Sequence, residues 1–411
     1  MSKLKSEELA KERLERIGKV MELKEPDRVP LAGVAGDIIP AYFGITQYEY
    51  NYDYEKSRKA IVKFLQDFPD DMTFAGLVGI GELPLSIAFS DYPDISPSIS
   101  FVSGPIHDVL GDKYARFPGR ELDKDSPPQF IGKEFMEPDE YDKLIEDPVR
   151  FIVETILPRV YRNLERPGSS QALATMIRLG TEVSKLTAFQ QALGADLVGL
   201  GYPPVIAFGY VPLDFIVDFL RDYTPLLFDL RRYPNKVKQA CEALVEPILK
   251  VALALKPAGA RLAFIPLHLN EYLSPELYNE FYWPHLKRII NELAKEGMKS
   301  LVFFEGWHDA HLETILELPR GWGIAYFEKT DVRKAKKILK GHTCVMGGVP
   351  LSLLLSGTPE KIDEHVKNLL EEVKPGGGFI LSSGTGIGFP REGPVENIKA
   401  MIDAVEKYGR Y

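Results

Sequence analysis

The sequence contains little cysteine and no long apolar run. Cys241 and Cys344 are the only cysteines in 411 residues, which excludes a disulfide framework and is typical of a reducing compartment. No segment approaches 18 consecutive apolar residues, and the charged residues 1–10 contain no apolar core that could serve as a signal peptide. We therefore expect a cytoplasmic protein without a membrane span.

Positive charge is also scarce. The formal net charge is −9, from 50 Lys and Arg against 59 Asp and Glu, and this argues against nucleic-acid binding, which needs a basic face. No Gly-x-Gly-x-x-Gly segment opens a helix near the N-terminus, and no Gly-Lys-Ser/Thr loop occurs, so the two common nucleotide-binding motifs are missing. The composition fits a soluble enzyme and does not indicate its substrate.

What the sequence does contain is a regular alternation of apolar strands and helices. Strands are predicted near residues 29–34, 68–74, 205–210, 261–268, 299–305, 322–328, 342–348 and 378–383. Helices are predicted between them, near 56–67, 213–231, 234–256, 274–296, 310–317, 359–373 and 394–409. This alternation predicts a parallel sheet with helices outside it. About eight strands favour a closed (β/α)8 TIM barrel, with an open doubly wound sheet as the alternative.

We predict one barrel domain over residues 1–411, with two additions. Residues 4–23 form an amphipathic helix rich in Glu, Lys and Arg, which prolines at 26 and 30 bring to an end. Residues 85–130 are rich in Pro, Ser, Asp and Tyr and are predicted to be an insertion or lid, followed by a helical stretch near 138–165. The oligomeric state stays open, with a homodimer among the states allowed.

Polar side chains follow several of the predicted strands. His268 ends one strand, Glu305 ends the next, and His308 follows in the loop. In a barrel these strand ends converge at the mouth, where active sites lie. His268, Glu305 and His308 could together hold a zinc ion, with a coordination position left open for substrate. The alternative is a polar pocket without metal, in which Glu305 and His308 act directly as catalytic groups.

Aromatic residues also collect at the strand ends. Tyr210, Phe304, Trp307 and Tyr326 are the candidate walls of a substrate pocket, and an aromatic, arginine-poor pocket suits a flat apolar molecule better than a polyanion. Asp37 follows the first strand and is a candidate catalytic base or substrate anchor, while a helix cap is the equally plausible structural role.

Several ordered motifs resemble the uroporphyrinogen decarboxylase superfamily. The segment Glu25-Pro-Asp-Arg-Val-Pro30 resembles its opening, and Leu273-Ser-Pro-Glu-Leu-Tyr-Asn-Glu-Phe281 with Pro284-His-Leu-Lys287 resembles a later motif. The glycine-rich tract from Cys344 onward resembles its last strands. The resemblance implies a (β/α)8 barrel and one of two activities: cofactor-free decarboxylation of a porphyrinogen, or methyl transfer to or from a corrinoid protein, commonly with zinc.

The sequence lacks the residues that are expected of the decarboxylases in this superfamily. Members with that activity carry an Arg-Gln-Ala-Gly-Arg type segment after the first strand, because arginine binds substrate carboxylates in a bidentate manner. The matching segment here is Ala32-Gly-Val-Ala-Gly-Asp-Ile-Ile-Pro40, and no arginine occurs between Arg28 and Arg58. Asp37 would also repel a carboxylate. Decarboxylation of uroporphyrinogen is therefore not expected.

The thiol-methylating members hold zinc with a His-x-Cys pair and a later Cys, which turn the acceptor into a thiolate. Here Phe303, Glu305 and Thr385 stand at the matching positions. The resemblance then favours O-demethylation, in which a methyl group passes from a methoxylated aromatic substrate to the Co(I) corrinoid of a separate carrier protein. That carrier is implied as the partner because no Asp-x-His-x-x-Gly corrinoid signature occurs. A thiol methyltransferase with altered ligands and, less favoured, a lyase or a non-catalytic scaffold are the alternatives.

Overall fold

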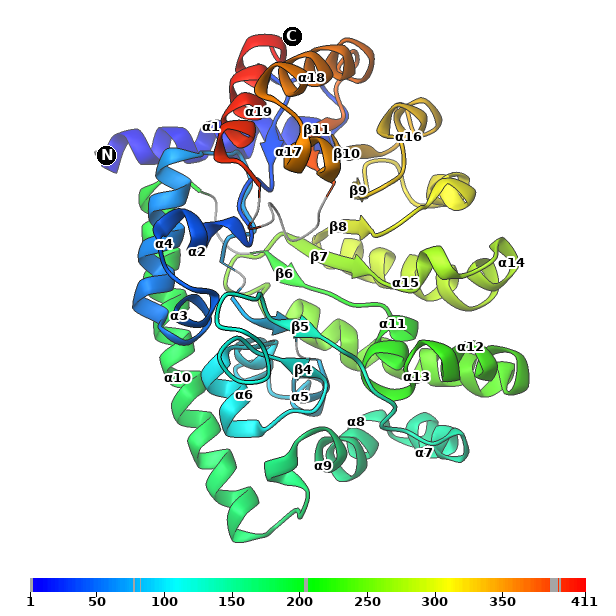
Figure 1. The fold of residues 1–411 in the computed structure, drawn as a ribbon. Helices are drawn as coiled ribbons and strands as arrows, with labels where there is room; N and C mark the ends of the chain where they lie inside the picture. Colours follow the sequence, from blue (N-terminus) through cyan, green and yellow to red (C-terminus); the bar gives the residue numbers. More distant parts are fainter. Residues whose placement is uncertain (1–2, 77, 82, 203–205, 385–390, 392) are drawn as a thin grey trace.

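The fold is an α/β barrel built on a parallel sheet (Figure 1). The computed structural model describes residues 3–76, 78–81, 83–202, 206–384, 391 and 393–411. The seven strands of the sheet are β1 (Leu31–Ala32), β6 (Ala207–Phe208), β7 (Leu262–Leu267), β8 (Lys299–Phe304), β9 (Gly323–Phe327), β10 (Cys344–Val349) and β11 (Phe379–Ser383). Their order is β1-β11-β10-β9-β8-β7-β6, and every pairing is parallel.

An eighth parallel segment lies on the other side of β1. Ala32 and Met72 form a parallel bridge, and the Gly33 backbone N–H donates to the Met72 carbonyl oxygen (3.1 Å). Among the described residues no ladder joins this segment to β6, but the rings of Phe74 and Phe264 lie 5.4 Å apart. The predicted α/β barrel fold is therefore confirmed, as a seven-stranded parallel sheet with an eighth parallel segment beside β1.

The barrel is filled by its own side chains. Alternate residues of the strands point inward because the side-chain period of a strand is two. They form a separate buried cluster that contains Ala32, Met72, Phe74, Phe264, Leu301, Phe303, Ile324, Tyr326, Cys344, Met346 and Ile380. Ile17 and Val20 of helix α1 (Lys3–Met21) belong to this cluster. Helix α1 thus closes the end of the barrel at which the strands begin.

Amphipathic helices cover the outside of the sheet (Figure 1). They are α4 (Tyr54–Asp67), α11 (Pro212–Ile216) with the π-helix η5 (Val217–Arg221), α12 (Tyr223–Arg232), α13 (Pro234–Leu253), α15 (Trp283–Lys295), α16 (Val332–Ile338), α18 (Pro359–Val373) and α19 (Val395–Tyr408). Helix α15 shows why they form. Proline stands near its start, where no hydrogen bond is lost, and Leu286, Ile289, Ile290 and Leu293 give it one buried face.

Residues 80–200 are the elaborated part of the barrel. Two small antiparallel pairs occur here, β2 (Ile80–Gly81) with β3 (Phe101–Val102) and β4 (Ala115–Arg116) with β5 (Gln129–Phe130). Short helices follow: α5 (Pro84–Ala88), α6 (Gly104–Leu110), α7 (Tyr141–Glu146), α8 (Pro148–Phe151) and α9 (Leu157–Val160). The predicted helical stretch at 138–165 is thus several short helices. The 30-residue helix α10 (Ser170–Gly199) was not predicted, and it runs along one side of the molecule beside α4 (Figure 1).

The remaining elements are short. Helices α2 (Ile38–Phe43) and α3 (Gln47–Tyr52) follow β1, α14 (Pro275–Leu277) and the π-helix η7 (Tyr278–Tyr282) precede α15, and the 3-10 helix η8 (Asp309–Glu317) follows β8. Helix α17 (Leu351–Ser356) follows β10. A membrane span would require a long apolar helix, and the described part of the chain contains none.

Candidate active site

The inward rows of the barrel end in polar residues at its upper mouth, where the strands finish. Phe303 pairs in register with Pro266 of β7 and with Tyr326 of β9. Two residues further along each strand, the same row continues with His268, Glu305 and Glu328. The mouth therefore brings an imidazole and two carboxylates from three neighbouring strands together.

His268 is held by a carboxylate and a phenol. Its Nδ1 lies 2.6 Å from Asp218 Oδ2 and 3.2 Å from the Tyr210 hydroxyl, and that hydroxyl also donates to Asp218 Oδ2. The opposite ring nitrogen, Nε2, lies 3.6 Å from Glu305 Oε1. The imidazole thus bridges a buried carboxylate below it and a half-buried carboxylate that faces the mouth.

A second buried carboxylate, Asp214, fixes the backbone of this loop. Its oxygens accept the backbone N–H groups of His268 (3.3 Å) and Leu269 (3.0 Å) and the hydroxyl of Tyr282. Asp214 and Asp218 lie four residues apart on α11 and η5, and this spacing puts both on one helix face, directed at the end of β7. The helix after β6 therefore positions the histidine at the end of β7.

These contacts shift the pKa values of the site. Burial favours neutral His268, but the charge and hydrogen bond of Asp218 outweigh it and raise the pKa of the imidazole to about 10. Burial raises the pKa of Glu305 to about 7, although the charge of His268 partly opposes this shift. Burial likewise raises the pKa of Asp214 to about 7. At neutral pH the site holds an imidazolium beside a carboxyl group that exchanges its proton.

The loop after Glu305 is rigidly built. The Gly306 N–H donates to Glu328 Oε2 (2.6 Å), and the Trp307 N–H donates to Glu271 Oε2 (3.0 Å). Gly306 has φ +64, and a Cβ there would lie 2.0 Å from the Glu271 side-chain carbon. Glycine suits this position because its φ is positive, and a larger residue would also displace the Glu271 side chain. The carboxylates of Glu271 and Glu328 are thereby fixed around the turn.

The structure does not bring the three predicted zinc ligands together. His308 is fully buried on the outer side of the sheet, where its ring packs 4.3 Å from Phe304, and its Nδ1 lies 3.4 Å from the Asn270 amide. His308 Nε2 has no hydrogen-bond partner among the described residues. Within the described ranges no three His, Cys, Asp or Glu side chains form a metal-binding group. The set His268, Glu305 and His308 therefore does not fit zinc, and Thr385 lies outside the described residues.

The predicted catalytic role of His308 meets the same obstacle. Burial and the neighbouring His311 lower the pKa of His308 well below its ordinary value, so it is a neutral packing residue. Its backbone N–H donates to the Thr330 hydroxyl (2.8 Å). His308 is separated from the mouth by the backbone of Glu305, whose carbonyl oxygen accepts from Asn270 (2.8 Å).

The four predicted aromatic walls separate into two groups. Tyr210 contacts His268 directly, and Trp307 is 61% exposed at the loop beside Glu305. Tyr326 lies inside the barrel below Glu328, where its hydroxyl donates to the Ser383 carbonyl (2.7 Å). Phe304 stacks on Phe327 on the outer side of the sheet, 5.1 Å between centroids. Tyr210 and Trp307 are placed to touch a ligand at the mouth, whereas Phe304 is not.

Asp37 lies at the start of helix α2, after β1. It occupies the N-cap position without a side-chain cap hydrogen bond, and its carbonyl oxygen accepts from the Gln47 amide (3.3 Å). After burial, the charge of Asp37 is the second cause that raises the pKa of Tyr50. These contacts run toward α3, so a role for Asp37 in catalysis stays a prediction.

Sequence reasoning missed Asp214 and Asp218. Both lie in the first turns of a helix, not at a strand end, where the search for polar residues was made. The available signal was a pair of acids one helical turn apart in the otherwise apolar stretch 211–220. A buried carboxylate requires a hydrogen-bond or ionic partner. This requirement marks Asp214 and Asp218 as candidates for a polar site.

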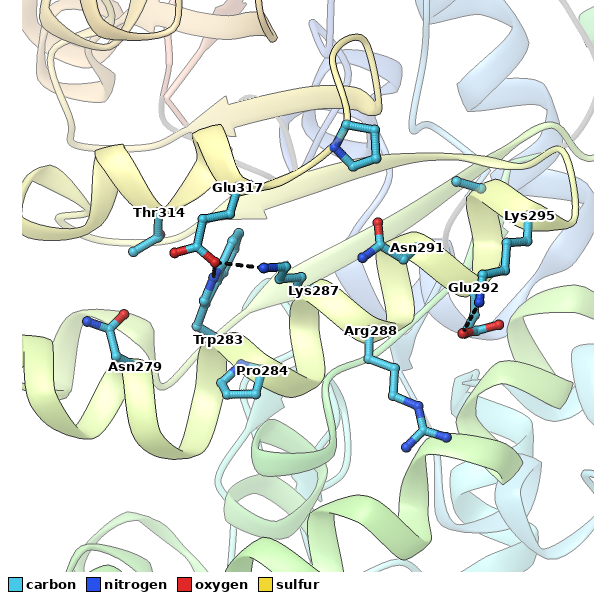
Figure 2. A pocket seen from close by; sticks show the side chains of 12 residues that line it. Asn279, Trp283, Pro284, Lys287, Arg288, Asn291, Glu292, Lys295, Thr314 and Glu317 are labelled. Carbon is cyan, nitrogen blue, oxygen red and sulfur yellow. Dashed lines mark hydrogen bonds and ion pairs between the residues drawn. The ribbon is translucent and has the colours of Figure 1, made fainter.

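A separate surface groove lies on the outside of the barrel. It has a volume of about 970 Å³ and runs along α15 and η8 (Figure 2). Lys287 donates to Glu317 there (2.8 Å), as does the indole of Trp283 (2.9 Å). No residue of this groove continues an inward row of the barrel, so we place the candidate active site at the mouth.

Comparison with known proteins relates the chain to one family. The model of the family described as uroporphyrinogen decarboxylase (URO-D) matches residues 199–408. A uroporphyrinogen decarboxylase of Anaeromyxobacter dehalogenans is 33% identical over 37% of this chain and 42% of its own length. One of Methylobacillus flagellatus is 31% identical over 36% and 42%. The chain thus spans about two fifths of the length of the curated relatives it matches.

Among solved structures, a methyltransferase from Methanosarcina mazei is similar over nearly the whole chain. The superposition has a TM-score of 0.60 and 15% sequence identity, and it covers 96% of this chain and 98% of that one. At this identity the similarity supports the fold.

Proposed function

The chain belongs to the uroporphyrinogen decarboxylase family. We propose that, within this family, it acts as a methyltransferase. It moves a methyl group from a small methoxylated aromatic substrate to the Co(I) corrinoid of a separate carrier protein. The observation that carries this proposal is His268, an imidazolium held by Asp218 at the mouth beside Glu305. Decarboxylation is disfavoured because the segment after β1 lacks the arginines that would bind a polycarboxylate.

The reaction needs a proton at the leaving oxygen. The bond between the methyl carbon and the ether oxygen breaks, and its electron pair stays on oxygen. The methyl carbon forms its new bond with the electron pair that the Co(I) co-substrate supplies. A free phenolate would lie among Asp218, Glu305 and Glu328, whose charges repel it. We assign His268 Nε2 as the donor that converts the departing oxygen to a phenol.

The pKa of His268 suits this task. At about 10 it matches the ordinary pKa of a phenol, about 10, so proton transfer to the departing oxygen has little free-energy cost. Glu305, with a pKa of about 7 and 3.6 Å from Nε2, is assigned to return the proton from solvent to the neutral imidazole. Asp218 keeps the ring oriented, with Nε2 toward the mouth.

Aromatic side chains support a flat substrate. Tyr210 lies 6.0 Å from Phe208, which in turn contacts Phe101 of the insertion at 5.2 Å. Rings at these separations form a wall on which another ring can pack. No zinc is assigned, because His308 is turned away from the mouth; orientation and protonation are the contributions expected of this chain.

The proposal is tested with the reduced corrinoid carrier and a panel of methoxyaromatics. We expect the spectrum of Co(I) to be replaced by that of the methylated corrinoid, together with one equivalent of phenol. His268→Gln should lower the rate at least 100-fold, while Lys407→Gln, on the outer surface, should not change it. Absence of any change with every donor, together with transfer of methyl from the methylated carrier to thiols, would reverse the proposed direction.

A further inference from the structure

A small cavity adjoins the candidate active site. It has a volume of about 220 Å³ and lies between the end of β5 in the insertion and the π-helix η5. Its walls include Phe130, Ile131, Val217, Asp218, Asp222 and Tyr223. Asp218 is shared between this cavity and the active site, because it also holds His268 Nδ1 at 2.6 Å. A ligand in the cavity is therefore one side chain away from the proton donor.

The cavity combines apolar walls with two carboxylates that retain free acceptors. Asp218 is 3% exposed, and its hydrogen bonds from Tyr210 and His268 both fall on Oδ2, which leaves Oδ1 without a partner among the described residues. Asp222 Oδ1 accepts the Tyr223 N–H (2.7 Å), and its Oδ2 has no partner in the described part of the chain. These two carboxylate oxygens are available to a ligand that donates hydrogen bonds.

Asp218 is paired with His268, whereas no basic side chain contacts Asp222 among the described residues. Arg221, next to Asp222, turns away and donates to Asp229 (2.6 Å) and Glu134. Lys133 and Glu134, which follow Gly132, are both exposed and of opposite charge. After burial, the charges of Asp218 and Asp214 are the largest causes that raise the pKa of Tyr223. In the described part of the chain, Asp222 is therefore the cavity-wall carboxylate without an ionic partner.

The backbone at Asp222 is held in an unusual conformation. Asp222 has φ +64 and ψ 163, directly after the π-helix, and a non-glycine residue there is sparsely populated. Single π-helical turns are frequent at functional sites. The turn places Asp222 on the cavity wall beside Asp218.

Aromatic rings pack in series between the cavity and His268. Phe130 lies 5.6 Å from Phe219, Phe219 lies 6.0 Å from Tyr210, and Tyr210 lies 5.6 Å from His268. Tyr223, on the opposite wall, contacts the exposed Tyr272 at 5.5 Å. Aromatic faces and carboxylates together form the usual environment for an organic cation.

We infer that this cavity binds a positively charged substituent of the methyl donor, with Asp222 as the counter-ion and Phe130 and Tyr223 as aromatic walls. The donor is then a methoxyarene that bears an ammonium side chain. Methoxylated aromatic acids are excluded from this position, because their carboxylate would meet Asp222 without a compensating base. The identification as a methyl donor rests on the proposed function, whereas the cation site does not.

The binding test uses the full chain and needs no corrinoid. Calorimetric titration compares 2-phenylethylammonium, phenylacetate and 2-phenylethanol, which share the ring and differ in charge. We expect the ammonium probe to bind at least tenfold more tightly than the other two, with affinity that falls as salt rises. Equal affinity for phenylacetate would overturn the inference.

Two variants and one control localise the site. Asp222→Asn keeps the shape and tolerates a positive φ, so we expect about tenfold weaker binding of the ammonium and unchanged binding of the alcohol. Phe130→Leu keeps the cavity apolar, and it should also weaken binding of the ammonium probe more than binding of the alcohol. Glu154→Gln removes an exposed carboxylate outside the cavity and should change nothing. Unchanged ammonium binding in both cavity variants would overturn the site.

Methyl transfer is then measured with 2-(3-methoxyphenyl)ethylammonium and (3-methoxyphenyl)acetate. We expect the ammonium donor to react with kcat/KM at least tenfold above the acid, a preference that Asp222→Asn should remove. Tight ammonium binding without any transfer would leave the cation site standing and refute the methyltransferase. Methyl transfer with a preference for the acid would support the methyltransferase and refute the cation site.

Discussion

The two ends of the barrel contain buried carboxylates that have different hydrogen-bond and ionic partners. At the lower end, Asp71 accepts from Arg16 (2.6 Å) and Arg28 (2.7 Å) and from the backbone of Leu31. At the upper end, Asp214 and Asp218 are paired with tyrosines, backbone N–H groups and His268, and no arginine contacts them among the described residues.

Burial determines the proton affinity of the acids that have no arginine partner. Asp70 is the useful intermediate, because it adjoins Asp71 at the lower end but has no arginine within hydrogen-bond distance in the described structure. Burial raises the pKa of Asp70 to about 7, as it does for Asp214 and Glu305. Asp70, Asp214 and Glu305 can therefore exchange protons at neutral pH, whereas Asp71 forms buried ion pairs with Arg16 and Arg28.

Removing the counter-charge of His268 should have the largest effect at the upper end. In Asp218→Asn, the charge and hydrogen bond that most strongly oppose burial are lost, so the pKa of His268 should fall from about 10. Methyl transfer should fall at least 100-fold. NMR titration of the imidazole protons measures the pKa, and a value unchanged from wild type would disprove the assigned pair.

The matching change at the lower end should act on stability instead. Asp71→Asn leaves Arg16 and Arg28 without a buried counter-charge, and we expect a loss of about 3 kcal/mol in the free energy of unfolding. Asp363→Asn, whose partner Lys407 is exposed, serves as the control and should cost under about 1 kcal/mol. Urea denaturation measures both. The comparison of the two ends fails if Asp71→Asn lowers methyl transfer per folded molecule as strongly as Asp218→Asn.

Glu305 should control the alkaline limb of the pH profile. Its carboxyl group has a pKa of about 7, so the protonated form that returns a proton to His268 is lost as the pH rises above 7. Glu305→Gln should lower the rate about tenfold and remove this limb. An identical pH profile in the variant would assign the limb to another group.

The smallest expected effect is on thermal stability. The folded pKa of His268, about 10, exceeds the unfolded value of about 6.5. The folded state therefore binds the proton more tightly, and this stabilisation is fully present below pH 6.5 and is lost as the pH rises through 10. The Tm difference between wild type and His268→Gln should shrink over this window by at most about 10 °C, because the pKa difference corresponds to about 5 kcal/mol and Tm changes on the order of 2 °C per kcal/mol. A Tm difference that grows with pH would contradict the assigned shift.

Much of the barrel was predictable because its strands are short apolar runs that stop at glycine or polar residues. The same pattern located His268 and Glu305, since strand ends converge at one mouth. Helix α10 was missed because Gly180, Gly194 and Gly199 interrupt it and its apolar residues are weakly segregated. Sequence pattern alone does not show that packing against α4 and α6 stabilises such a helix.

The error over His308 has a local cause. Alternation along β8 predicts inward and outward side chains only while the strand continues. Gly306, with φ +64, turns the chain, so the direction of His308 no longer follows from counting residues after Glu305. Asp218, in contrast, supports His268 from a helix 50 residues away in sequence. A partner at that separation is visible only once the chain has folded.

Helix α1 affects the order in which the substrates bind and the product leaves. Because Ile17 and Val20 are packed into the lower end of the barrel, that end is closed, and we expect substrates to enter at the mouth. A corrinoid carrier seated over that opening would trap whatever lies beneath it. We therefore expect a compulsory sequence, in which the methyl donor enters first, the carrier docks second, and the demethylated product departs only after the carrier has left.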